Sequence, residues 1–79
     1  MYTLQELTFT RVMPRKDGIF AFAKYPQWWT EYGFLLQPDG KVIGKTHDGN
    51  WVELTQELSS FVCGKIKAIL REEPGRVYA

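Results

Sequence analysis

Three Asp-Gly pairs divide the first two thirds of this chain into short segments. They are Asp17-Gly18, Asp39-Gly40 and Asp48-Gly49. Glycine adopts positive φ at little cost and aspartate bonds nearby backbone groups, so each pair predicts a tight turn. Segments joined by such short turns must pair as antiparallel neighbours. A chain of 79 residues cut in this way has room for a single domain, residues 1–79, and for no second core.

The segments before residue 25 have the side-chain alternation of β-strands. In the first, Pro14 is expected to end the pairing, because proline lacks the backbone donor. Before it, alternate residues are expected to point to the same face of the strand: Leu7, Phe9, Arg11 and Met13. In the second segment, Ile19 to Lys24, the two phenylalanines are expected on one face and the alanines on the other.

Three further strands are predicted between residues 30 and 54. They span about 30–37, 41–46 and 51–54. Because only tight turns separate them, they form a predicted β-meander over residues 30–54.

The spacing of apolar residues changes after residue 54. They now recur at intervals of three and four, which is one face of an α-helix: Leu58, Phe61, Val62, Ile66, Ile69 and Leu70. Thr55 can cap this helix and Pro74 ends it, which predicts a helix over about 55–73 and a tail over 74–79. Gly64 inside it is expected to mark a close approach to the sheet. The predicted fold is α+β, a four- to five-stranded, mostly antiparallel β-sheet with one C-terminal helix packed on one face.

Composition and charge exclude several classes of protein. With 44% apolar residues the chain is not disordered, and its net charge of +1 gives no strong attraction to polyanions. No apolar run approaches the ~20 residues of a membrane span, and no secretion signal is expected at the N-terminus. The lone Cys63 favours a reducing compartment, so a cytoplasmic protein without membrane contact is predicted.

The residues needed for catalysis or metal binding do not form motifs. Cys63 and His47 offer two ligands where structural zinc needs four, and neither has the setting of a nucleophile or its base. Gly44-Lys45-Thr46 lacks the upstream glycine and the following helix of a phosphate-binding loop. We therefore predict no enzymatic activity, no cofactor and no metal, and the motifs identify no family.

The aromatic segment from Tyr25 to Tyr32 is the feature that points to a function. Trp28 and Trp29 are adjacent, so on an extended backbone they face opposite ways and one is expected to be partly exposed. Packing of both in the core is the alternative. Exposed aromatic side chains are typical anchors of protein interfaces. The predicted partner-binding residues are Tyr25, Trp28, Trp29, Tyr32, Arg15 and Lys16.

Two functions follow from these residues. The first is a small non-enzymatic interaction module, an inhibitor or regulator, that binds a partner protein of unknown identity through the surface around Trp28, Trp29 and Tyr32. A homodimer is its simplest form, since the first strand or the tail could leave an edge unpaired. The alternative is a nucleic-acid-binding domain that uses the aromatic segment together with three basic residues, Arg11, Arg15 and Lys16.

Overall fold

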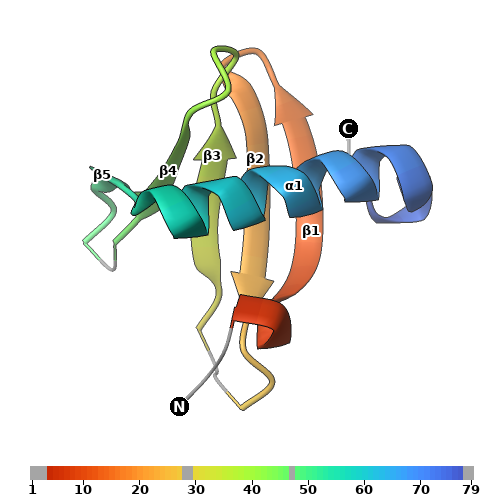
Figure 1. Cartoon of the computed structure of the whole chain (residues 1–79), viewed down its shortest axis with the longest axis horizontal. Coiled ribbons are helices and arrows are strands. Elements are labelled where there is room, and N and C mark those ends of the chain that lie inside the picture. The colour runs from red at the N-terminus through yellow and green to blue at the C-terminus, as the bar shows by residue number, and fades with distance from the viewer. Residues whose placement is uncertain (1–3, 28–29, 47, 78–79) are drawn as a thin grey trace.

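The structure, a computed structural model, describes residues 4–27, 30–46 and 48–77 (Figure 1). Short 3-10 turns lie at both ends of the described chain, η1 (Leu4–Glu6) and η2 (Pro74–Arg76). Between them come five strands and one helix, namely β1 (Thr8–Arg15), β2 (Gly18–Lys24), β3 (Tyr32–Leu36), β4 (Val42–Lys45), β5 (Trp51–Glu53) and α1 (Gln56–Glu72). The predicted α+β fold is confirmed.

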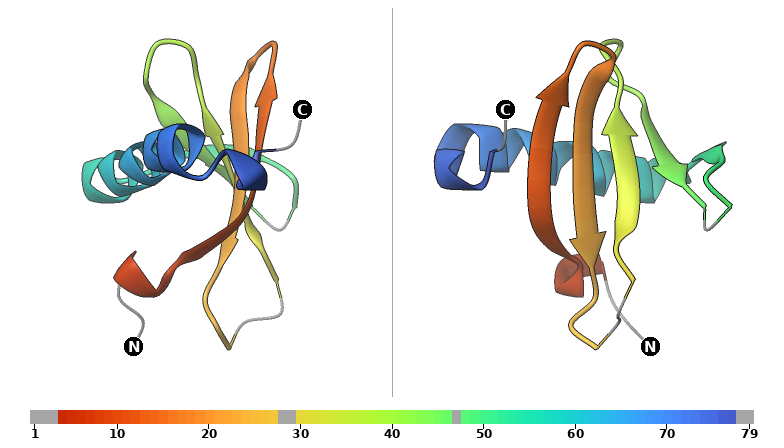
Figure 2. Two further views of the ribbon diagram at one scale, coloured as in Figure 1. Left: turned by 90° about the vertical axis from the view of Figure 1, so that its right-hand side faces the viewer. Right: turned by 180° about the vertical axis from the view of Figure 1, so that it is seen from behind.

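The five strands form one sheet in chain order, β1-β2-β3-β4-β5, with every neighbouring pair antiparallel. Strands β3 to β5 are the predicted meander, each slightly shorter than expected. The helix α1 crosses one face of this sheet, and the views in Figure 2 show the two as separate layers.

The set of β1 side chains that points into the core changes part-way along the strand. The alternation in the sequence did not predict this change. Phe9 pairs with Ala23 and Arg11 pairs with Phe22, so the register shifts between them and leaves Thr10 as a bulge. The single proton of the Thr10 hydroxyl is shared between the carbonyl oxygen of Phe22, at 3.2 Å, and the carboxylate of Glu31. Beyond the bulge Val12, not Arg11, points into the core. The expectation that Arg11 shares a face with Phe9 is wrong, because an inserted residue reverses the alternation.

Pro14 does not end the pairing of β1. It lies opposite Ile19, and pairing continues to Arg15 and Gly18 at the turn. Proline is tolerated on an edge strand, where a missing backbone donor need not interrupt the ladder. The first hairpin is therefore longer than the sequence indicated.

The helix begins and ends close to the predicted positions. The Thr55 hydroxyl accepts a hydrogen bond from the Leu58 backbone N–H at 3.3 Å, which caps the first turn. Its inner face is fully buried at Val62 and Ile66. Gly64, however, faces solvent, and a methyl group there would meet nothing within 4 Å. The expected close approach of Gly64 to the sheet is wrong.

The core lies between α1 and the covered face of the sheet. Its members come from β1 to β4, from the helix and from the residue before β1: Leu7, Phe9, Val12, Ala21, Ala23, Phe34, Leu36, Val42, Val62, Ile66 and Ile69. The two alanines of β2 lie at its centre, fully buried, because their small side chains leave room for the helix. The predicted separation of alanines and phenylalanines on β2 therefore holds for the alanine face.

The C-terminal tail packs back against the sheet. Val77 forms a parallel bridge with Val12 on the outer edge of β1, and Arg76 Nη1 donates to the Phe9 carbonyl oxygen at 3.1 Å. The tail thus occupies part of the edge that the sequence suggested was unpaired. No helix in the described part of the chain is long and apolar enough to span a membrane.

Candidate functional site

The second face of the sheet is covered by no described helix or strand. In the view from behind, β1, β2 and β3 lie in front of the helix with nothing between them and the viewer (Figure 2). The strand registers place one set of side chains on this face, which we call the open sheet face: Arg11, Met13, Phe20, Phe22, Leu35, Ile43, Lys45, Trp51 and Glu53. Most of these are apolar.

Part of the open sheet face forms a small apolar cluster of its own. The rings of Phe20 on β2 and Trp51 on β5 have centroids 5.8 Å apart, although two strands separate them. They reach each other because twisted sheets curl and both side chains are long. Leu35, between these strands, is only 8% exposed as a result, whereas Trp51 remains 38% exposed.

Two cations lie against aromatic rings on this face. The Arg11 guanidinium carbon is 4.4 Å from the centre of the Phe22 ring, and Lys45 Nζ is 5.8 Å from the centre of the Trp51 ring. Arg11 also pairs with Glu31 at 3.2 Å, and that carboxylate accepts a hydrogen bond from the Thr10 hydroxyl as well. Among the described residues Lys45 has no carboxylate partner, so its charge is open to a ligand.

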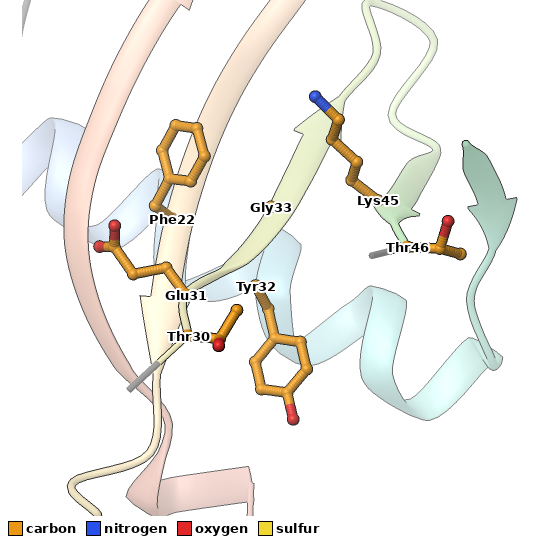
Figure 3. Close-up of a pocket in the computed structure, with 7 residues that line it drawn as sticks. All are labelled: Phe22, Thr30, Glu31, Tyr32, Gly33, Lys45 and Thr46. Carbon is orange, nitrogen blue, oxygen red and sulfur yellow. The ribbon is translucent and has the colours of Figure 1, made fainter. Parts of the chain in front are cut away.

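A groove of about 440 Å³ lies beside these rings (Figure 3). Phe22 and Lys45 stand on either side of Gly33, which forms its floor. A methyl group at Gly33 would lie 3.4 Å from Lys45 Cβ and 3.7 Å from Phe22 Cε1. The absence of a side chain at Gly33 therefore leaves the groove open between Phe22 and Lys45. Thr30, Glu31 and Thr46 supply hydroxyl and carboxylate groups to the lining. Tyr32 also lines the groove, but its ring is directed away from it, toward Tyr25 and the core.

The structure divides the predicted site residues between two ends of the molecule. Tyr25 and Tyr32 lie together, with ring centroids 6.2 Å apart in an edge-to-face arrangement, and both pack against the core. Arg15 and Lys16 lie at the opposite end of β2, beside the turn into Gly18. Seven residues of extended chain separate Gly18 from Tyr25, roughly 20 Å. The structure therefore does not bring the two predicted groups together.

Two of the predicted basic residues, Arg11 and Arg15, lie on the open sheet face. Arg15 belongs to the far end of the open sheet face, where its Nη2 lies 3.6 Å from Met13 Sδ. Arg11, from the nucleic-acid alternative, is the basic residue that does lie beside the groove. Trp28 and Trp29 lie outside the described residues, so the prediction that one of them is exposed stays a prediction.

The aromatic residues that the sequence prediction missed are Phe20, Phe22 and Trp51. The alternation in β2 did place the two phenylalanines on the face opposite the alanines. It could not add Trp51, because its proximity to Phe20 depends on the register of four strands and on the curl of the sheet.

An ion pair links β5 to the segment before β4. Lys41 Nζ donates to Glu53 Oε1 at 2.5 Å, between two exposed side chains. This hydrogen bond, and then the charge of Lys41, lowers the pKa of Glu53, while Glu53 raises the pKa of Lys41. The carboxylate therefore stays charged on the edge of the sheet at neutral pH.

The described residues contain no group of three or more His, Cys, Asp or Glu side chains placed to hold a metal ion. Cys63 lies half-buried on α1, and His47 lies outside the described residues. What the open sheet face offers is apolar area, aromatic rings and a free cation. Comparison of the chain with family models, with curated proteins and with solved structures finds no match.

Proposed function

We propose that this chain is a non-enzymatic protein-interaction module that binds a partner protein through the open sheet face. The observation that carries the proposal is the row of apolar side chains on a sheet face that no described element covers. Monomeric proteins rarely leave such a surface exposed unless it has a partner. A module of this kind acts as an inhibitor or regulator by occupying part of its partner's surface.

The composition of the open sheet face fits a protein partner. Aromatic and arginine side chains dominate the binding energy of protein interfaces, and here Phe20, Phe22, Trp51 and Arg11 lie close together. The groove over Gly33 would accept an apolar side chain, and Lys45 beside it would pair with a carboxylate of the partner. Tyr32, the first residue of β3, lines the same groove, as do Thr30 and Glu31 of the segment before it. A reducing compartment such as the cytoplasm suits the unpaired Cys63.

The test compares partner capture by the wild-type chain, Phe22→Thr and Gly64→Ala. Phe22→Thr keeps a good strand former but removes the ring beside the groove and under Arg11. Gly64→Ala is the matched control, because Gly64 faces solvent on the helix. Circular dichroism first establishes that both variants fold.

We expect quantitative mass spectrometry of proteins captured from an extract of the source cell to identify a partner retained by wild type and Gly64→Ala. Its recovery should fall at least about tenfold with Phe22→Thr, as for loss of an interface anchor. If every captured protein is recovered equally by all three chains, the open sheet face is not the binding site.

Single-stranded nucleic acid is the second candidate, favoured by the cations that lie over aromatic rings at Phe22 and Trp51. Bases stack on such rings while cations contact phosphates. The net charge of +1 and the pairing of Arg11 with Glu31 weigh against it. Fluorescence anisotropy with labelled oligonucleotides at two salt concentrations decides the matter. Binding that weakens as salt rises and is lost in Phe22→Thr would support this function, and binding that is absent or insensitive to salt would reject it.

A further inference from the structure

Strand β5 is the free edge of the sheet. The outer edge of β1 carries the Val77 bridge, whereas no described element lies beyond β5 in Figure 1 or in the right-hand view of Figure 2. The two large hydrophobic residues that are most exposed among those described both belong to this three-residue strand, Trp51 at 38% and Val52 at 45%. They point to opposite faces of the sheet. An edge with apolar side chains on both faces is a template for another strand.

The hydrogen-bond pattern shows which backbone groups this edge presents. The Thr46 N–H donates to the Asn50 carbonyl oxygen at 2.8 Å, in line with the β4–β5 register that pairs Gly44 with Val52. Hydrogen-bonded pairs alternate along an antiparallel ladder, so Val52 directs its backbone groups toward β4. The residues on either side of it, Trp51 and Glu53, then direct their N–H and C=O groups outward. The outward backbone groups of Trp51 and Glu53 form no hydrogen bond with another described segment.

We propose that a second copy of this chain binds at this edge, with the two β5 strands antiparallel and related by a two-fold axis at Val52. This register overlaps all three residues of β5. It places Trp51 of each copy opposite Glu53 of the other, where the outward backbone groups of both can exchange hydrogen bonds. Val52 then meets the second copy's Val52 on the face that carries the helix.

In this register Lys45 of one copy and Glu53 of the other, which carry opposite charges, lie on the same face of the combined sheet. Lys45 pairs with Trp51 within the chain and holds its ammonium over that ring. In the proposed register Glu53 of the second copy follows Trp51 in the same row across the strands, so its backbone lies two strand spacings, about 10 Å, from that of Lys45, a gap that two long side chains can span. The side chain of Glu53 is 76% exposed in the single chain, and only one of its carboxylate oxygens, Oε1, pairs with Lys41, so Oε2 can make this contact. A net charge of only +1 leaves little repulsion between two copies.

Sliding the pairing by two residues in one direction would set Glu53 against Glu53 of the second copy, which like charges disfavour. Sliding it in the other direction would leave Glu53 beyond the paired strand. The charge pattern therefore selects the register centred on Val52. The short edge buries little area, so we expect a weak, concentration-dependent dimer.

Two charge reversals test the register directly. In Lys45→Glu the glutamate at position 45 faces the second copy's Glu53, and in Glu53→Lys the lysine at position 53 faces the second copy's Lys45. Each variant alone should dimerise at least about tenfold more weakly than wild type. A mixture of the two restores opposite charges on both sides of the axis and should associate as a heterodimer.

Sedimentation equilibrium from about 10 µM to about 1 mM measures these associations, the range in which small interfaces form. Val52→Lys, which places two ammonium groups at the axis, should be monomeric throughout, while the uncharged Val52→Thr should still dimerise. Circular dichroism establishes that each variant is folded. A wild-type chain that stays monomeric to about 1 mM would overturn the proposal, as would dimerisation unaffected by Val52→Lys or a mixture no stronger than its components. The two proposed surfaces share Lys45 and Trp51, but the capture experiment changes Phe22, which lies on β2 and takes no part in the β5 pairing. A failure of partner capture can therefore be told apart from a failure to dimerise.

Discussion

Gly18→Ala should destabilise the domain by several kcal/mol. Gly18 opens β2 with φ of +140°, a conformation that side chains rarely adopt. A methyl group there would also lie 2.3 Å from the carbonyl oxygen of Leu36. That oxygen belongs to the backbone of the central strand β3 and cannot move without disturbing its pairing. Backbone strain costs about 1–3 kcal/mol and the clash adds to it, against a total stability of about 4–12 kcal/mol for this length.

Gly40→Ala is the matched control. Gly40 has φ of +94°, yet a methyl group there would meet nothing within 4 Å. Gly40→Ala therefore introduces backbone strain without a clash, and we expect the free energy of unfolding to fall by only about 1–2 kcal/mol. Urea denaturation measures the free energy of unfolding of both variants. Equal losses would mean that the close approach between Gly18 and β3 does not exist in the folded chain.

The sequence predicted the elements of the fold well because each has a local cause. The Asp-Gly pairs made turns, Thr55 caps the helix, and the three- and four-residue spacing from Leu58 onward follows its inner face. The errors have causes outside the local pattern. The bulge at Thr10 is a shift in the register between β1 and β2, and Pro14 is tolerated because of the edge position of β1 in the sheet.

The candidate site could be predicted only in part from the sequence. Alternation along β2 indicates which face carries Phe20 and Phe22, but it does not indicate which face the helix covers. Trp51 joins them across β3 and β4 only because the sheet curls. The sequence prediction grouped Arg15 and Tyr25 in one binding surface, yet β2 holds them at opposite ends. Distances across a sheet follow from register, and register is a property of strand pairs.

Ile66→Ala should cost about 2–5 kcal/mol, a large share of the stability of so small a domain. Ile66 is fully buried on the inner face of α1, in the same cluster as Val12 and Val42. Its truncation leaves a cavity that the sheet cannot close, because the strands are held by their backbone pairing. The free energy of unfolding, from urea denaturation monitored by circular dichroism, measures the loss.

Phe22→Ala is the comparison that connects this prediction to function. It removes more side-chain volume than Ile66→Ala, but from a half-exposed position on the open sheet face. Because less apolar area is withdrawn from water there, the loss should be clearly smaller than for Ile66. That outcome leaves the Phe22 ring available to a partner at little cost to folding. If Phe22→Ala were as destabilising as Ile66→Ala, the open sheet face would be a second core, and its aromatic rings would serve the fold rather than an interface.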